Sequence, residues 1–289
     1  MPRTAGSMAA SDTTNSARRR TLDELMVESA RMTRVQRSRN FLVAAIFIVI
    51  VAYTYNKTEF DIGALLTHAD NMGRVLGGFS HPDTAQLPII IKLTLETLYI
   101  AILGTTLGAV IAVPLSFFGA RNLMRRNFVG TVAYFTIRFL MAVIRSIPTL
   151  FWGILWVIVI GIGPFPGVLA VTTFSVGLIS KLFSEAIEAV DWGPVEALTA
   201  TGANPVQVVI HGVVPQVMPY MIANILYSFE VNVHSSTILG AVGAGGIGLL
   251  LIEYIGLFEY SQLAMLLIVV IVMTSTIDYS SAAIRRRII

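Results

Sequence analysis

The stretch Asp191–Pro215, with the sequence DWGPVEALTATGANPVQVVIHGVVP, lies between two long apolar segments and contains no lysine or arginine. Its Gly-Ala-Asn-Pro at 202–205 predicts a break between two short helices, because a residue before proline disfavours the helical conformation. Asp191 is suited to cap the first helix, and Pro194 to its first position, where a missing N–H costs no hydrogen bond. Glu196 is then expected in the first turn, where the helix dipole favours negative charge. These features predict a helical hairpin that links two membrane spans.

The composition of the whole chain agrees with a location in a membrane. Of its 289 residues, 55% are hydrophobic and only 13% are charged, and the mean hydropathy is +0.75. Soluble domains carry about 25% charged residues. The chain has no cysteine, which excludes disulfides and thiol chemistry, and its four histidines are scattered without metal-ligand spacing. The sequence therefore predicts an all-α, polytopic membrane protein without a metal or another cofactor.

Six apolar segments are long enough to cross a bilayer, which needs about 17–25 residues; the first is near the lower limit. The third is too long for one upright span, and Pro148 is expected to kink it. Within the second, Gly104 and Gly108 form a small-xxx-small pair that allows another helix to approach closely. The predicted spans are Asn40–Asn56, Pro88–Phe118, Phe128–Ile162, Val168–Val190, Gln216–Gly240 and Tyr260–Ile284.

The positive charges predict how these spans are oriented. Fourteen of the twenty lysines and arginines lie in three segments, 1–40, 121–126 and 285–287, whereas the loops on the other side carry only Lys57 and Arg74. Because positive residues accumulate on the cytoplasmic side, both termini and the stretch 191–215 are expected in the cytoplasm. Arginines next to a span indicate orientation and contact with membrane lipid rather than nucleic-acid binding.

The same pattern divides the chain into three parts. Residues 1–40 form a basic arm, rich in Ser, Thr and Ala, that is expected to be largely disordered. Residues 41–87 contain the first transmembrane helix and an external loop. Residues 88–289 form the main transmembrane domain, which includes the hairpin at 191–215.

Ionisable residues inside membrane spans are costly and are therefore candidates for function. They are Glu96, Arg138, Arg145, Lys181, Glu185, Glu230, His234 and Asp278. Glu230 and His234 are four positions apart, so they share one face of the fifth span. Either Glu230 and His234 satisfy each other or a neighbouring helix, or the polar run to which they belong lines a water-filled translocation path. The members of this run are Glu230, Asn232, His234, Ser235, Ser236 and Thr237.

No set of residues in the sequence predicts catalysis by this chain. No nucleophile with a base is apparent, and the sequence has no His-Glu-x-x-His. The glycine-rich run Gly240–Gly248 lacks the Gly-Lys-Ser/Thr of a nucleotide-binding loop and is expected to permit close packing or irregular backbone inside the protein.

The spacing within the hairpin resembles the EAA loop of binding-protein-dependent ABC transporter permeases. That loop reads Glu-Ala-Ala, three residues, Gly, nine residues and Ile-x-Leu-Pro. Three residues of the hairpin depart from this pattern, namely Leu198, Gly212 and Val214. The matching residues are Glu196, Ala197, Gly202 and Pro215. In that family the loop forms a coupling helix that docks into a cytoplasmic ATPase subunit. The resemblance implies that the matching residues serve ATPase coupling.

Three further stretches resemble the permeases of phosphonate ABC transporters. They are IRSIPTLFWGILWV at 144–157, LISKLFSEAIEAV at 178–190 and SFEVNVHSSTILGAVGAGGIG at 228–248. The similarity covers roughly Leu87–Ile284. It implies a type I ABC importer permease fold, with the five-helix core of methionine-type importers and an added first span. It also implies a homodimer in a prokaryotic cell membrane, two ATPase subunits, and an extracytoplasmic binding protein that delivers phosphonate, phosphate or phosphite.

Two other functions agree with the residues alone. One is a proton-coupled secondary transporter of a small anion, with Glu230, His234 or Asp278 as proton sites. The other is a membrane anchor or sensor subunit of a lipid-modifying enzyme. An ATPase is expected to co-purify only with an ABC permease.

Overall fold

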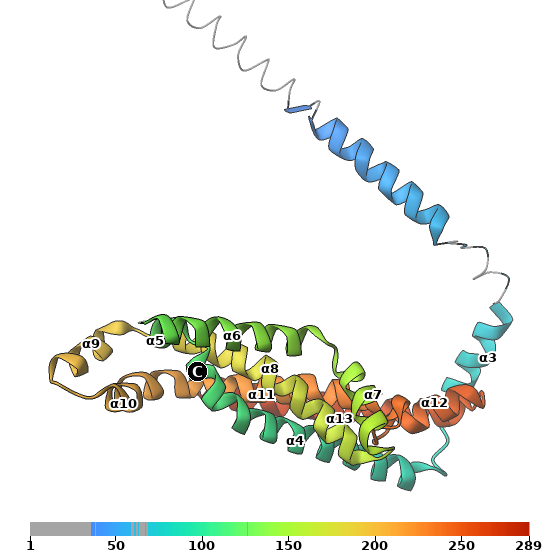
Figure 1. Ribbon diagram of the computed structural model, residues 1–289. Coiled ribbons are helices and arrows are strands. Elements are labelled where there is room, and N and C mark those ends of the chain that lie inside the picture. The colour runs from blue at the N-terminus through green and yellow to red at the C-terminus, as the bar shows by residue number, and fades with distance from the viewer. Residues whose placement is uncertain are drawn as a thin grey trace, which may run out of the picture. The chain divides into compact units, whose positions relative to one another are not determined.

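The computed structural model describes residues 36–37, 39–58, 61, 63, 67, 69–125 and 127–288 (Figure 1). The chain divides into two compact units, Met1–Asp70 and Asn71–Ile289. The predicted disordered arm at 1–40 lies almost entirely outside the described residues. In the first unit, the helix Arg39–Lys57 has only exposed side chains and is apolar enough to cross a membrane. At about 1.5 Å per residue it is close to the thickness of a bilayer core, so it confirms the first predicted span.

The described part of the second unit is helical throughout, with short turns between the helices. Its helices, labelled in Figure 1, are α3 (Ala69–Phe79, which begins at the end of the first unit), α4 (Leu87–Phe118), α5 (Arg121–Met124), α6 (Phe128–Ser146), α7 (Thr149–Ile160), α8 (Pro164–Glu188), α9 (Trp192–Ala200), α10 (Pro205–Val208), the π-helix η1 (Val209–Val213), α11 (Val214–Leu239), the 3₁₀ turn η2 (Gly240–Val242), α12 (Gly248–Gly256) and α13 (Tyr260–Ile288). Six helices in the described residues, with α10 to η2 counted as one, are long and apolar enough to span a membrane, as predicted.

Helix α8 is the centre of this unit, since 61% of its most apolar 18-residue stretch is buried. This share is larger than in any other candidate span of the described residues. It packs on α4 through the two glycines of the small-xxx-small pair. A methyl group at Gly104 would lie 2.5 Å from Val171 Cβ, and one at Gly108 would overlap Ser175. The predicted close approach of a helix to this pair is confirmed, and the approaching helix is α8.

The third predicted span is broken rather than kinked. Helix α6 ends at Ser146 and α7 begins at Thr149, with Pro148 in an extended conformation between them. Proline cannot donate a backbone hydrogen bond and disfavours a helical conformation in the residue before it, which ends α6. The indole N–H of Trp152 donates to Ile144 O at 3.3 Å and holds the two helices across the break. The following turn contains Gly161, with φ 107°, and α8 begins at Pro164, earlier than predicted.

The glycine-rich run after α11 has an irregular backbone, as predicted. Gly243, Gly245 and Gly246 have φ of about 80°, a conformation that favours glycine. The run packs on α4, where Glu96 Oε1 accepts a hydrogen bond from Gly246 N at 2.9 Å and Thr97 Oγ1 accepts one from Ile247 N at 2.8 Å. The intramembrane carboxylate of Glu96 thus has a backbone partner.

Candidate functional site

The hairpin Asp191–Pro215 begins at the predicted cap, Asp191, and breaks at the predicted Gly-Ala-Asn-Pro of residues 202–205. Asp191 Oδ1 accepts a hydrogen bond from Gly193 N at 3.0 Å and caps α9. After α9, Asn204 and Gln207 form a capping box, in which each side chain accepts from the other's backbone N–H at 2.8 and 3.0 Å. Asn204 therefore starts the second helix.

Two details of the predicted hairpin are wrong. Helix α9 begins at Trp192, so Pro194 is its third residue and Glu196 lies in the second turn, beyond the strongest part of the helix dipole. The second helix is also not separate, because α10 continues through η1 into α11. Pro215 cannot donate to the carbonyl four residues earlier, and the wider π turn at Val209–Val213 accommodates it without ending the helix.

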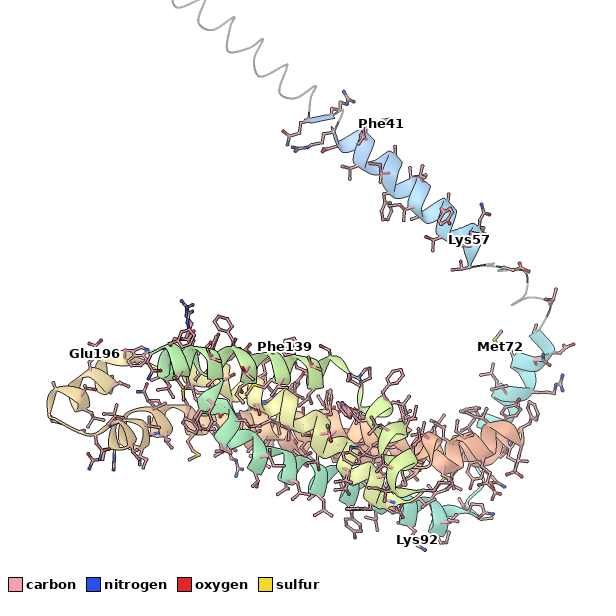
Figure 2. All side chains as sticks on the ribbon, in the orientation of Figure 1. Phe41, Lys57, Met72, Lys92, Phe139 and Glu196 are labelled. Atoms are coloured by element: carbon pink, nitrogen blue, oxygen red, sulfur yellow. The ribbon has the colours of Figure 1, made fainter. Side chains whose placement is uncertain are left out.

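The hairpin buries one face and exposes the other. Val195 is buried against the hydrophobic cluster of α8 and α11, which includes Phe183 and Val217. The residues that match the EAA motif are exposed: Glu196, Ala197, Gly202 and Pro215. Gly202 has φ 83°, which explains why glycine follows α9. Figure 2 shows Glu196 on the hairpin, at one end of the second unit, which we call the hairpin end.

Glu196 has no structural task within the part of the chain that the structure describes. It makes no hydrogen bond or ion pair there. Two large apolar side chains of the same hairpin, Val206 and Ile210, are 65% and 51% exposed. A hairpin that exposes an unpaired carboxylate and large apolar side chains is suited to contact another protein.

The base of the hairpin is closed by one glutamine. Gln216 Oε1 accepts from Asp191 N, and Gln216 Nε2 donates to Asp191 O, both at 3.2 Å. The same Nε2 donates to Gly212 O at 2.6 Å. The start of α9 is therefore fixed to the start of α11.

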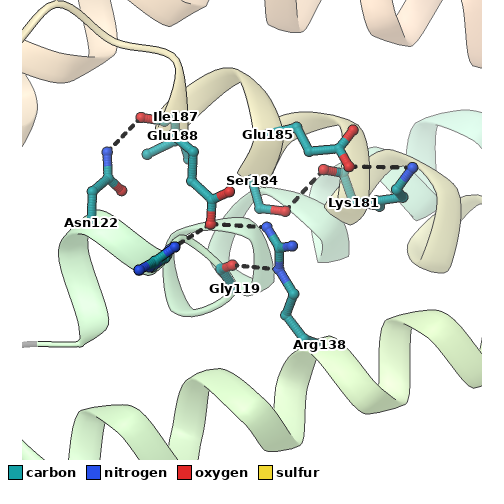
Figure 3. A network of polar contacts seen from close by, with 9 residues as sticks. Gly119, Asn122, Arg138, Lys181, Ser184, Glu185, Ile187 and Glu188 are labelled. Atoms are coloured by element: carbon teal, nitrogen blue, oxygen red, sulfur yellow. Dashed lines mark hydrogen bonds and ion pairs between the residues drawn. The ribbon is translucent and has the colours of Figure 1, made fainter. Parts of the chain in front are cut away.

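A second set of contacts, which we call the Arg138–Glu188 cluster, holds the end of α8 just before the hairpin (Figure 3). Arg138 pairs with Glu188 Oε1 at 2.9 Å and donates from Nε to Gly119 O at 3.2 Å. The same Oε1 accepts from Arg121 N at 2.7 Å, and Asn122 Nδ2 donates to Ile187 O at 2.8 Å. The cluster joins the adjacent ends of α4, α5 and α8 to α6. The sequence did not predict that Arg138 and Glu188 pair.

The polar run of α11 is divided between two faces. Asn232 and Ser236 are fully buried, and Asn232 Nδ2 donates to Thr105 Oγ1 and Ser175 Oγ, both at 2.7 Å. The run thus joins α11 to α4 and α8 in the interior.

The other residues of the run lie at least partly open to the surface of the single chain. Glu230 pairs with Arg285 of α13 at 2.8 Å, and His234 lies 3.7 Å from Asp278 of the same helix. The hydroxyls of Ser235 and Thr237 donate to backbone carbonyls one turn earlier in α11. A neighbouring helix therefore supplies the partners of Glu230 and His234, which do not pair with each other.

The two hydrogen bonds of Asn232 predict a modest structural effect. We expect Asn232→Leu to cost about 1 kcal/mol, since interhelical hydrogen bonds in membranes contribute about 0.6 kcal/mol each. The melting temperature is expected to fall by about 2–4 °C. Ser235→Ala, on the more exposed face, is the control and should leave the melting temperature unchanged. An unchanged melting temperature in Asn232→Leu would contradict this structural role of Asn232.

The hairpin and the helical bundle define a class of membrane protein. Residues 112–289 match the family model of the binding-protein-dependent transport system inner membrane component, and the chain belongs to this family. It is 36% identical over 244 residues to the phosphite transport system permease protein PtxC of Stutzerimonas stutzeri, covering 84% of this chain and 87% of that protein.

Two further comparisons extend the similarity. The chain is 38% identical over 228 residues to the phosphate-import permease protein PhnE of Mycolicibacterium smegmatis, covering 79% of this chain and 42% of that protein. Its fold is similar to that of one chain in an inward-facing structure of the MetNI methionine ABC transporter. The TM-score is 0.63 and the sequence identity is 24%, and the match covers 72% of this chain and 99% of that chain.

These comparisons establish the type of protein. The chain is the permease component of an ABC importer and a multi-pass cell-membrane protein of a prokaryote, with the predicted type of fold. It is a transport component and not an enzyme, since ATP hydrolysis belongs to a separate subunit in such systems. The alternatives of a proton-coupled transporter and of an anchor subunit are thereby set aside.

Proposed function

We propose that this permease forms the translocation path for small phosphorus oxyanions, namely phosphonates, phosphate or phosphite. An extracytoplasmic binding protein would deliver the anion to a homodimer of permeases with two ATPase subunits. The cargo class is supported by the relatives, which are named for phosphite transport and phosphate import. The coupling role is supported by one observation above all: the EAA-like residues are exposed on a hairpin that is firmly held at its base.

In this proposal the hairpin is the cytoplasmic contact of the ATPase. Glu196, Ala197, Gly202 and Pro215 belong to the contact surface, and Gln216 and the Arg138–Glu188 cluster connect it to the membrane helices. ATP binding would close the ATPase dimer and move both hairpins. Because the base of each hairpin is hydrogen-bonded to α11 and lies next to the cluster, this movement would reach the helices that line the path.

The proposed path lies on the side of α8 and α11 that a second copy would cover. In the single chain, the side chains of the pairs Lys181–Glu185 and His234–Asp278 are all between 37% and 56% exposed. Leaving such groups against lipid is costly, whereas a water-filled path or a partner subunit can solvate them. Four residues of α11 are proposed to line the path: Glu230, His234, Ser235 and Thr237. The buried residues Asn232 and Ser236 are proposed to hold α11 in place behind the path.

The test compares ATP hydrolysis and uptake by the reconstituted complex, for wild type and Glu196→Ala. Hydrolysis should be stimulated by the binding protein loaded with a phosphonate, phosphate or phosphite. We expect the substitution to reduce uptake about fivefold, which corresponds to the loss of one contact of ~1 kcal/mol. Glu253→Ala, at an exposed carboxylate of α12, is the matched control.

Each outcome bears on one part of the proposal. Stimulation by none of the three anions would reject the cargo class. An equal loss of uptake in Glu196→Ala and Glu253→Ala would reject the coupling role of Glu196. The same uptake in Glu196→Ala as in wild type would also reject it. Failure of any ATPase to co-purify would contradict the proposed assembly.

A further inference from the structure

A recess beside the Arg138–Glu188 cluster contains two arginine side chains that the proposed transport mechanism does not use. It has a volume of about 600 Å³ and lies where α4 turns through α5, next to the end of α8. Arg121, Asn122, Arg125 and Glu188 line it. It is therefore a polar recess at the hairpin end, with two arginines in its wall.

The charges in the recess are unbalanced. Glu188 is already matched by Arg138 at 2.9 Å and by the backbone N–H of Arg121 at 2.7 Å. The guanidinium groups of Arg121 and Arg125 form no ion pair with any carboxylate in the described part of the chain. Two positive charges thus face the recess without a counter-charge, which is suited to an anion with several oxygen atoms.

One of these arginines is held next to an apolar surface. The guanidinium carbon of Arg125 lies 5.8 Å from the centre of the Phe135 ring, and Phe135 is 57% exposed. The same outward face of α6 carries further exposed side chains at helical spacing, with Phe139 labelled in Figure 2: Phe128 at 83%, Val132 at 50% and Phe139 at 67%. From Phe128 to Phe139 this apolar face is about 16 Å long, roughly half the thickness of the hydrocarbon core.

The recess and the face of α6 together match the two parts of one kind of molecule. We propose that an anionic phospholipid binds here, with its phosphate between Arg121 and Arg125 and an acyl chain along the apolar face of α6. A soluble anion would use the arginines but would leave the apolar face without a partner. A lipid of this kind ties α5 to α6 beside Glu188, so its binding should stabilise the permease.

The test measures the melting temperature of the full permease complex in vesicles of phosphatidylcholine, with and without phosphatidylglycerol. We expect phosphatidylglycerol to raise the melting temperature of wild type and to raise that of R121Q/R125Q by less than half as much. R286Q/R287Q removes the same charge from two exposed arginines at the end of α13 and should respond like wild type. R121K/R125K keeps the charge and should retain most of the response, which guards against a folding defect in the glutamine variant.

A second measurement counts the bound lipid. Native mass spectrometry of the purified complex should find phosphatidylglycerol retained by wild type and R286Q/R287Q, and lost from R121Q/R125Q. If phosphatidylglycerol raised the melting temperature of R121Q/R125Q and R286Q/R287Q equally, the lipid would be attracted to the charged surface without a specific site. This result would overturn the proposal. A full rise in melting temperature with inorganic phosphate in phosphatidylcholine vesicles would also overturn it, in favour of a soluble anion. Neither outcome depends on which cargo is transported.

Discussion

Adding one methyl group at each of Gly104 and Gly108 is expected to remove most of the correctly assembled permease. Each methyl group would be placed against α8, at 2.5 Å from Val171 Cβ and in overlap with Ser175, respectively. Both sites face the most buried helix of the unit, so neither α4 nor α8 can move away without losing core contacts. Overpacking of this kind costs about 1–3 kcal/mol per site, and the double variant should melt about 5–20 °C lower.

The variant Gly108→Ala has an additional consequence. Ser175, which its methyl group would displace, also accepts the hydrogen bond from Asn232. The substitution therefore disturbs the contact of α8 with α11 as well as its contact with α4.

The measurement is the yield of monodisperse protein in detergent, together with its melting temperature. Gly73→Ala is the control, since a methyl group there would meet nothing within 4 Å and alanine favours a helix more than glycine does. If Gly104→Ala/Gly108→Ala behaved like this control, the packing of α4 on α8 would have to be different from the one described.

The second large effect is expected for Arg138→Gln. Arg138 and Glu188 are only 33% and 27% exposed, so removal of the arginine leaves a partly buried carboxylate that keeps the N–H of Arg121 as its hydrogen-bond partner. Hydrogen bonds to charged groups contribute about 1.5–3 kcal/mol, and uptake is expected to fall about tenfold or more as the end of α8 loses its fixed position. ATP hydrolysis should fall less than uptake, because the contact surface for the ATPase remains in place.

A double-mutant cycle tests whether the pair itself is responsible. R138Q/E188Q leaves no unpaired charge and should be less impaired than R138Q alone. K181Q/E185Q removes a more exposed pair, with a 3.2 Å contact one turn apart on the same helix, and should cost less than about 1 kcal/mol in stability. Equal losses of stability in R138Q and K181Q/E185Q would contradict a special role for the cluster.

The parts of the fold that depend on local chemistry were predictable from sequence. The caps at Asp191 and Asn204 follow from side chains that bond to the backbone within three residues. The packing at Gly104 and Gly108 follows from two small residues one helical turn apart, and the spans follow from length and composition. Local chemistry did not settle whether Pro148 would kink or end a helix, because α7 also depends on packing against α8.

The partners of the polar residues were not predictable, since they come from distant segments. Glu230 and His234 share a face of α11, which left open whether they pair with each other or with a neighbouring helix, and α13 brings Arg285 and Asp278 to them. Asn232 lies two positions from each, and this spacing places it on the interior face, where α4 and α8 supply hydroxyls. The division of the run could have been expected from helical periodicity, whereas the identities of the partners require the tertiary structure.

The continuity of the hairpin with α11 has a mechanical consequence. The helix Pro205–Val242 is one rod whose two weak points, the π turn at Val209–Val213 and Pro219, both lie near the hairpin. From Val213 to Val242 the rod is about 45 Å long, so a pivot of about 5° at its base would carry its far end sideways by about 4 Å. We therefore expect a small rotation delivered at the hairpin to be amplified, by leverage alone, into a displacement as wide as a small oxyanion.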